Sequence, residues 1–171
     1  MARDDGYMSV KLRHEFETLL IDEYWLLDNS HFEDWLDLMS DAIRYWAPVR
    51  ENLDRNEEDF FQPDLLTHFD ENKTEMGLRV ARLRTGSAHA EEPPSRQRHF
   101  VSNIKILDAS EPNLIKVASN FIVFRSRPGY EEHLFIGSRR DRWLRLDNNW
   151  RLLERLIIFD HDVIENITVF V

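Results

Sequence analysis

The chain has 171 residues, of which 42% are hydrophobic and 12% aromatic, enough to bury one sizeable core but too few for two independent ones. Its 32 acidic and 22 basic residues give a formal net charge of -10, which argues against the basic face that nucleic-acid binding requires. The sequence contains no cysteine, which excludes disulfides, thiolate nucleophiles and Cys-ligated zinc or iron–sulfur sites within it. We therefore expect one domain over residues 1–171.

Targeting and metal-binding signals are missing from the sequence. The opening MARDDGYMSV has no apolar core of signal-peptide length, and no run of about 18 uncharged apolar residues occurs. The seven histidines do not have the spacing of metal ligands on a helix. We expect a soluble, cytoplasmic protein with no membrane partner and no metal of its own.

The first part of the chain has helical periodicity. Apolar residues recur at three- and four-residue steps, which predicts an amphipathic helix over residues 9–28. Ser30 followed by Glu33 is a capping-box pattern, which predicts a second helix over residues 31–39.

Strand-like alternation follows these helices. AIRYWAPVR predicts a strand over residues 42–50, and Pro48 indicates the end of that strand or an edge of the sheet. Helical periodicity returns over residues 70–84. Four alternating segments with short turns between them then predict strands within residues 99–160, where Gly137 suggests a bend or bulge. The resulting fold class is α+β, with about three helices packed on the concave face of a strongly curved antiparallel sheet.

Arginine is unusually frequent on the predicted C-terminal strands of this acidic chain. One interpretation is a sheet face that contacts other subunits, because arginine is favoured at interfaces. The other is a solvated face on which Glu131, Asp141 and Glu154 neutralise the arginines. Interleaved tryptophans favour the interface. The arginines are Arg125, Arg127, Arg139, Arg140, Arg142, Arg145, Arg151 and Arg155, and the tryptophans are Trp46, Trp143 and Trp150.

The segment AHAEEPPSRQRHFVSNIKI, residues 88–106, joins the third predicted helix to the first long strand. Pro93 and Pro94 fix two φ angles and make the segment stiff. A stiff, charged, exposed connector suits docking in a fixed pose better than proton transfer in a dry pocket. We expect it to belong to an assembly surface.

The order of elements resembles the cystatin-like or NTF2-like cone fold. Within that fold, LRVARLRTGSAHAEEPPSRQRHFVSNIKI, residues 78–106, is similar to the small, beta subunit of Rieske-type aromatic-ring-hydroxylating dioxygenases. YWAPVR, FIVFRSR, GSRRDRWLR and the final NITVFV extend the likeness to nearly the whole chain. Gln97 departs from it, since threonine is common at this position.

This resemblance implies a structural role beside a large alpha subunit, in a hexamer of three alpha and three beta chains that also contact one another. The alpha subunit is expected to carry the Rieske [2Fe–2S] cluster and a mononuclear Fe(II). NADH-derived electrons would arrive through a reductase and often a ferredoxin, and O₂ would convert an aromatic hydrocarbon, expected to be naphthalene-like, to a cis-dihydrodiol. No catalytic, cofactor-binding or metal-binding residue is then expected in this chain.

An alternative is that the cone acts alone, as a small isomerase or dehydratase or as a small-molecule binding module. Such enzymes pair a buried Asp or His base with a tyrosine that polarises a carbonyl. The candidates are Tyr24, Asp41, Tyr45 and His99, although each also suits an ordinary core or turn position.

We predict subunit contacts where arginine, proline and aromatic residues gather near the strands. Arg96 and Arg98 are expected to form charge-assisted bonds across such a contact. The full set of candidates is Trp46, Pro93, Pro94, Arg96, Arg98, His99, Arg127, Arg140, Arg142 and Trp143.

Overall fold

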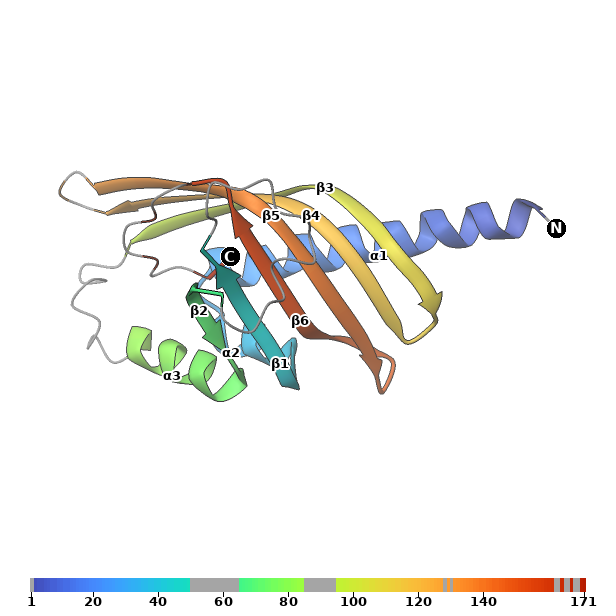
Figure 1. Ribbon diagram of the computed structural model, residues 1–171, viewed down its shortest axis with the longest axis horizontal. Helices are drawn as coiled ribbons and strands as arrows, with labels where there is room; N and C mark the ends of the chain where they lie inside the picture. Colours follow the sequence, from blue (N-terminus) through green and yellow to red (C-terminus); the bar gives the residue numbers. More distant parts are fainter. Residues whose placement is uncertain are drawn as a thin grey trace.

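The segments with helical periodicity form a layer on one side of a curved sheet, which is built from the segments with alternating periodicity (Figure 1). The computed structural model describes residues 2–49, 65–84, 95–127, 129, 131–161, 164, 167, 170 and 171. Side chains of residues 2–8 and 131 are not among those described. The elements in chain order are α1 (Ala2–Asp28), α2 (Phe32–Asp37), β1 (Met39–Pro48), β2 (Thr67–Glu71), α3 (Lys73–Arg84), β3 (Arg96–Glu111), β4 (Leu114–Arg127), β5 (Glu131–Leu146) and β6 (Asn149–Phe159).

The sheet has six strands in the order β2-β1-β6-β5-β4-β3. Strands β3 to β6 form consecutive antiparallel hairpins, and β2 pairs antiparallel with β1, but β1 runs parallel to β6. The sheet is therefore mixed: the predicted antiparallel pairing holds for every neighbouring pair except β1 with β6, which is parallel. Alternation predicts which residues share a face, but it carries no information on the direction of a strand that pairs across a long crossover.

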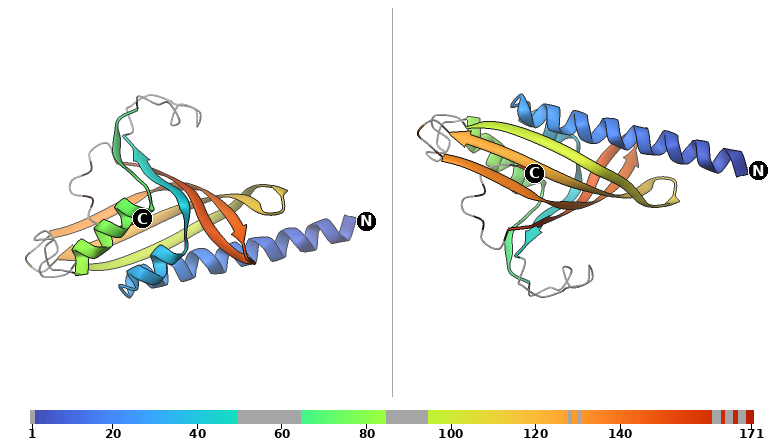
Figure 2. Two further views of the ribbon diagram at one scale, coloured as in Figure 1. Left: turned by 90° about the horizontal axis from the view of Figure 1, so that it is seen from below. Right: turned by 90° about the horizontal axis from the view of Figure 1, so that it is seen from above.

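Helix α1 lies across one face of the sheet, and its N-terminal turns extend past the strands (Figures 1 and 2). It covers the predicted range 9–28 and begins earlier, at Ala2. Its buried stripe includes Phe16 and Leu20, and the Phe16 ring lies 5.1 Å from that of Trp150 on β6. Among the described helices, none combines the length and apolarity needed to cross a bilayer.

The chain turns between α1 and α2 at Ser30, whose φ of 59° is left-handed. The N-cap of α2 is His31, without a side-chain hydrogen bond, so the predicted capping box of Ser30 and Glu33 is wrong. Ser30 closes α1 instead, and the Glu33 carboxylate accepts hydrogen bonds from Arg84 on α3. A left-handed turn residue cannot also serve as the extended N-cap of the next helix.

A capping box does occur at the start of α3. The Asn72 side-chain oxygen accepts from the backbone N–H of Thr74 at 2.9 Å and of Glu75 at 3.1 Å, and the Glu75 carboxylate accepts from the Asn72 N–H at 2.8 Å. The helix therefore begins after Asn72. Residues 70 and 71, predicted to be helical, belong to β2, where Phe69 stacks on Tyr45 of β1 with 5.5 Å between ring centroids.

Gly137 lies in a stretch of β5 with regular pairing to both neighbours, opposite Phe121 and Phe159. The bulge in this region lies further along, between Arg142 and Trp143. A Cβ on Gly137 would come within 2.2 Å of the Ile158 backbone oxygen and 2.8 Å of the Phe121 ring. Close approach of these neighbours, rather than a bulge, requires glycine here.

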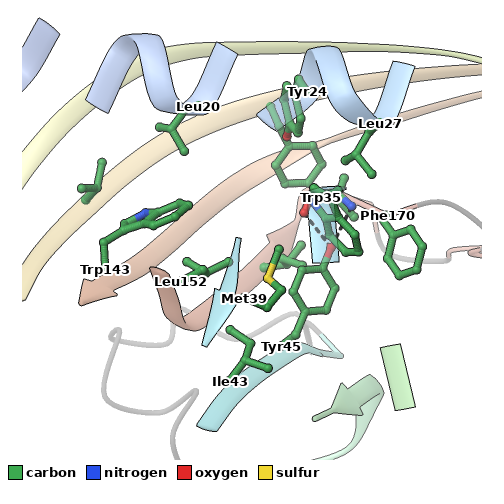
Figure 3. Close-up of a cluster of buried hydrophobic side chains, with 14 of the residues drawn as sticks. Leu20, Tyr24, Leu27, Trp35, Met39, Ile43, Tyr45, Trp143, Leu152 and Phe170 are labelled. Atoms are coloured by element: carbon green, nitrogen blue, oxygen red, sulfur yellow. Dashed lines mark hydrogen bonds between the residues drawn. The ribbon is translucent and has the colours of Figure 1, made fainter. Parts of the chain in front are cut away.

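The core fills the space between the helices and the inner face of the sheet. In Figure 3, Leu20, Tyr24 and Leu27 point down from α1 toward Trp35, Met39 and Tyr45. All of these side chains are buried. Aromatic residues supply much of the packed area, as expected for a chain in which they make up 12% of residues.

Candidate functional site

A network of buried charged side chains joins α1 to the centre of the sheet. Arg155 on β6 donates to the Asp141 carboxylate on β5, at 2.9 Å from Nε and 2.8 Å from Nη2. Its Nη2 also donates to Glu23 Oε2 on α1 at 2.9 Å, and Trp35 Nε1 donates to Glu23 Oε1 at 3.1 Å. Glu23, Asp141 and Arg155 are all buried. Each charge has the partners that ions removed from water require.

The ionisation of this network follows from its geometry. Burial alone would raise the pKa of Glu23, but the positive charges of Arg155 and Arg139 and hydrogen bonds from Arg155 and Trp35 lower it to about 2. Burial likewise opposes the charge of Arg155, yet Asp141 and Glu23 raise its pKa well above the ordinary value. Glu23 is therefore a fixed negative charge at neutral pH. A carboxylate held this firmly is unsuited to general-base catalysis, for which the pKa should lie near the working pH.

Arg139 and Tyr24 extend the network inside the cone. The Arg139 guanidinium carbon lies 4.6 Å from the centroid of the Tyr24 ring, and its Nη1 is 3.6 Å from Glu23 Oε2. Its Nε donates to Ser119 Oγ at 3.3 Å. Among the described residues, both Nη atoms of Arg139 and the Tyr24 hydroxyl lack hydrogen-bond partners. Burial raises the pKa of Tyr24, which keeps the hydroxyl protonated.

His99, at the start of β3, uses both ring nitrogens within the chain. Nδ1 lies 2.7 Å from Asp28 Oδ1 at the end of α1, and Nε2 lies 2.9 Å from the backbone oxygen of Phe170. The backbone N–H of His99 also donates to Asp28 Oδ1 at 3.0 Å. The Tyr24 ring packs against the imidazole, with 4.8 Å between centroids. His99 therefore joins α1, β3 and the C-terminal residues, and neither ring nitrogen is free to accept a substrate proton.

The C-terminal residues themselves fill part of the interior. Phe170 and Val171 are buried, and the Phe170 ring lies 4.4 Å from that of Trp35 (Figure 3). The Tyr45 hydroxyl donates to the Val171 oxygen at 2.7 Å and accepts from the Val171 N–H at 2.8 Å. Burial raises the pKa of Tyr45 to about 12, so the hydroxyl remains a donor. The space that a ligand would need beside Tyr45 is occupied by the chain itself.

The residues of the acid–base alternative are therefore only partly brought together. Tyr24, Tyr45 and His99 lie in the interior. Asp41 does not, because its side chain is 99% exposed and accepts a hydrogen bond from Lys73 Nζ at 2.8 Å. That hydrogen bond and the charge of Lys73 lower the pKa of Asp41. Asp41 cannot serve as the buried base of an interior site, because its side chain points from β1 into solvent.

Three interface candidates meet on the opposite, outer face of the sheet. Trp46, Arg140 and Arg142 line a hollow of about 420 Å³ there, together with Lys116 and Leu156. Arg142 donates to Glu154 Oε2 at 2.7 Å, a cross-strand pair of the kind that the alternative interpretation of a solvated face expects. Their outward positions follow from alternation along β5, where Asp141 faces inward between them.

The remaining candidates are dispersed. Arg96 and Arg98 are exposed on β3, and Arg98 Nη1 lies 3.2 Å from Asp28 Oδ2. Arg127 is half-buried at the end of β4. Trp143 is fully buried in the core, so it presents no surface in the isolated chain. Pro93 and Pro94 lie outside the described residues, as does the side chain of Glu131.

The buried arginines were not anticipated by the reading of the strands as a single arginine-rich face. Arg125, Arg139 and Arg155 point inward with less than 2% exposure. One available signal was Glu23, a carboxylate placed between Leu20 and Leu27 in the buried stripe of the first helix. A charge at a core position predicts an opposite charge facing it.

Comparison with known proteins gives the family. The family described as "Ring hydroxylating beta subunit" matches residues 22–166, most of the chain. This chain belongs to that family. The resemblance to beta subunits of ring-hydroxylating dioxygenases, predicted from the sequence, is thereby confirmed.

Solved structures agree on the fold of this beta subunit. Naphthalene 1,2-dioxygenase with indole bound in its active site includes a chain that is 24% identical, with a TM-score of 0.83, over 95% of this chain and 86% of that one. The benzoate 1,2-dioxygenase beta subunit from Burkholderia mallei is 17% identical, with a TM-score of 0.73, over 92% and 96%. An NTF2-like protein with a cystatin-like fold from Novosphingobium aromaticivorans is 15% identical, with a TM-score of 0.57, over 93% and 86%. The cone fold predicted from the sequence is confirmed.

As a beta subunit, the chain is one component of a ring-hydroxylating enzyme, and its family implies an alpha subunit as partner. Within the described part of the chain, no three His, Asp or Glu side chains are grouped so that they could hold a metal ion.

Proposed function

We propose that this beta subunit is the structural component of a multicomponent dioxygenase that converts an aromatic hydrocarbon and O₂ to a cis-dihydrodiol. The chemistry would take place in the alpha subunit, which would carry a Rieske [2Fe–2S] cluster and a mononuclear Fe(II). Electrons from NADH would reach it through a reductase and a ferredoxin, in the cytoplasm.

The observation that carries this proposal is the family match over residues 22–166. The absence of cysteine supports the placement of the cluster in the partner, since a Rieske centre needs two cysteine ligands. The fold neighbours named for naphthalene and benzoate dioxygenases support an aromatic substrate. We propose a naphthalene-like hydrocarbon, selected by a pocket of the alpha subunit.

The interior of the cone supports a structural rather than a catalytic role for this chain. His99 and Tyr45 hold the backbone at Phe170 and Val171, and Glu23 is fixed as an ion by Arg155. Groups that must exchange protons with a substrate need free atoms and suitable pKa values. These side chains are instead used in holding the helices and the C-terminal residues on the sheet.

For the assembly, we propose three alpha and three beta chains, with contacts between neighbouring beta chains as well as between alpha and beta. The chain has ten more acidic than basic residues, 32 against 22. Its basic surface regions are therefore suited to contacts with acidic surfaces of neighbouring chains. Arg96 and Arg98 remain candidates for one of these contacts.

The test is co-expression of the tagged beta chain with an untagged large subunit from the same enzyme system. We expect the two to co-purify at equal stoichiometry, with visible absorbance from the iron–sulfur cluster, and light scattering to give the mass of a hexamer. With reductase, ferredoxin and NADH, the complex should convert naphthalene to a cis-dihydrodiol, and benzoate serves as the competing substrate. A monomeric chain that is catalytically active on its own would overturn the proposal.

Charge reversal tests the contribution of the two β3 arginines. Arg96→Glu with Arg98→Glu should reduce recovery of the complex, because a buried charge-assisted contact becomes repulsive. Lys11→Glu with Arg13→Glu, which reverses two exposed basic residues on α1, is the control for the change in charge. Recovery of the Arg96/Arg98 variant at the level of this control would show that these two arginines lie outside the subunit contacts.

A further inference from the structure

A hollow of about 750 Å³ lies between residues 9–15 of α1 and the inner face of the sheet, where α1 runs beside β3 (Figure 2). Its floor is apolar and includes Leu12 on α1, Ile115 on β4 and Trp150 on β6. Ile115 and Trp150 are 2% and 8% exposed, so the floor is continuous with the core. A concave apolar site of this volume is large enough for a small organic ligand.

Three basic side chains border the hollow, and all three are exposed. Lys11 and His14 lie about one turn apart on α1, and Arg145 lies near the end of β5. In the described part of the chain, neither the ammonium of Lys11 nor the ring of His14 has a hydrogen bond or an ion pair. The guanidinium of Arg145 contacts the Trp150 ring and no described carboxylate. These donors are therefore available to a ligand. We call this site the α1 hollow, defined by Lys11, Leu12, His14, Ile115, Arg145 and Trp150.

The carboxylate that lines the α1 hollow already has a partner. Glu15 Oε1 accepts a hydrogen bond from Trp150 Nε1 at 2.8 Å. Two permanent cations against this one carboxylate leave the α1 hollow positive, although the chain carries a net charge of -10. Exposed arginines elsewhere on the surface are instead paired with acids, as in the pairs Arg13–Glu17, Arg44–Asp70 and Arg84–Glu33. Cations without such partners around an apolar floor indicate that the missing negative charge comes from a ligand.

We propose that the α1 hollow binds an aromatic carboxylate, with the ring over the apolar floor and the carboxylate at Lys11 and His14. A carboxylate accepts charge-assisted hydrogen bonds from an ammonium and hydrogen bonds from an imidazole N–H.

The aromatic ring is inferred from Arg145. Its guanidinium carbon lies 5.3 Å from the centroid of the Trp150 ring, and its side chain is exposed. A planar guanidinium can stack on aromatic faces from both sides. The ligand ring would therefore cover the face of Arg145 that Trp150 leaves open.

A ligand with both parts fits the α1 hollow better than a ligand with either part alone. An inorganic anion would satisfy the cations but leave the apolar floor in water, and a neutral aromatic molecule would cover the floor but leave the cations without a counter-charge. The proposal concerns a ligand of the beta subunit itself, and it does not depend on the reaction proposed for the complete enzyme.

Isothermal titration calorimetry with 2-naphthoate tests the proposal, on the full beta chain and on its complex with the large subunit. Acetate, which lacks the ring, and 2-naphthalenemethanol, which lacks the charge, are the comparison ligands. We expect one 2-naphthoate per beta chain in both preparations, and binding of either comparison ligand weaker by about tenfold or more. The proposal is refuted if 2-naphthoate does not bind or if the neutral alcohol binds equally well. Binding to the chain but not to the complex would assign the α1 hollow to a subunit contact, and this result would also overturn the proposal.

Variants of the full beta chain then locate the ligand. Lys11→Gln with Arg145→Gln should weaken binding of 2-naphthoate by about tenfold or more. Arg96→Gln with Lys105→Gln removes the same charge from exposed positions on β3 that do not line the α1 hollow, and should change the affinity by less than about twofold. An equal loss in both pairs would mean that the ligand responds to overall charge and has no site in the α1 hollow.

A third variant blocks the space and keeps every charge. Ala109 is an exposed residue of β3 that lines the α1 hollow, and Ala109→Trp should abolish binding because the indole occupies the place of the ligand ring. Circular dichroism and the midpoint of urea denaturation verify that each variant is folded. A folded Ala109→Trp chain with unchanged affinity would place the ligand elsewhere and refute the assignment.

Discussion

Replacing Glu23 by glutamine removes one charge from the buried network and leaves its volume almost unchanged. Arg155 then keeps Asp141 as partner but loses the second carboxylate, which accepts from its Nη2 at 2.9 Å. Breaking a buried ion pair on one side costs about 3–5 kcal/mol. The pKa of Glu23 gives a second route to the magnitude: the gap between its ordinary value of 4.5 and about 2 corresponds to about 3 kcal/mol of stability. The two routes agree.

The pH dependence follows from the same pKa. Since folding lowers the pKa of Glu23, its contribution is complete above the ordinary value of 4.5 and is lost as the pH falls toward about 2. Urea denaturation of wild type and Glu23→Gln at pH 7 should therefore differ by about 3 kcal/mol. At pH 3 the difference should be smaller by roughly half, because Glu23 is protonated in the unfolded chain at this pH but still mostly ionised in the folded one.

Glu33→Gln is the matched control, because Glu33 also binds an arginine, Arg84, but is mostly exposed. A surface ion pair contributes about 0–1 kcal/mol. The reasoning fails if Glu23→Gln costs no more than Glu33→Gln at pH 7, or if the gap between wild type and Glu23→Gln stays constant from pH 7 to pH 3.

Two further predictions concern stability and are read by the same urea denaturation at pH 7. Tyr45→Phe should cost about 1–3 kcal/mol, because the buried N–H and oxygen of Val171 lose their partner; an unchanged midpoint would mean that the C-terminal residues do not need this hydroxyl. Gly137→Ala should destabilise by about 1–3 kcal/mol or more, because the new Cβ meets the Ile158 oxygen at 2.2 Å. Gly77→Ala, in α3 with its nearest neighbour 4.0 Å away, should stabilise by about 0.5–1 kcal/mol, and effects of the same sign at the two glycines would contradict the argument.

Features set by local periodicity were predictable from the sequence. The helix over 9–28 and the succession of four C-terminal strands depend on neighbours three, four or two residues apart, and the structure has α1 and β3 to β6 there. The strand β2 was missed because it is only 5 residues long and adjoins α3. The capping box at Asn72 was a local signal that would have separated the two, since Glu75 follows it at the required spacing.

Features set by tertiary pairing were not predictable in the same way. Alternation along β5 puts Arg139, Asp141 and Trp143 on one side and Arg140 and Arg142 on the other, but the prediction treated these arginines as one sheet face, and alternation does not say which side is buried. Both sides carry arginine, and arginine is rarely buried without a partner. The partner that decides the question, Glu23, lies more than 100 residues away on α1. Sequence spacing therefore could separate the two faces of the strand, but it could not give the environment of each arginine.

The buried network determines the position of α1 on the sheet. Asp141 and Arg155 lie directly opposite each other on β5 and β6, and Glu23 joins the same arginine from the helix above them. An apolar contact could slide along the sheet at little cost, whereas this pairing is satisfied only when α1 lies in one place. Trp25 lies half a helical turn from Glu23 and is 57% exposed, so the pairing that fixes the buried side of α1 also fixes its exposed side relative to the sheet. We infer that the costly buried ion network serves to hold α1 in this one position.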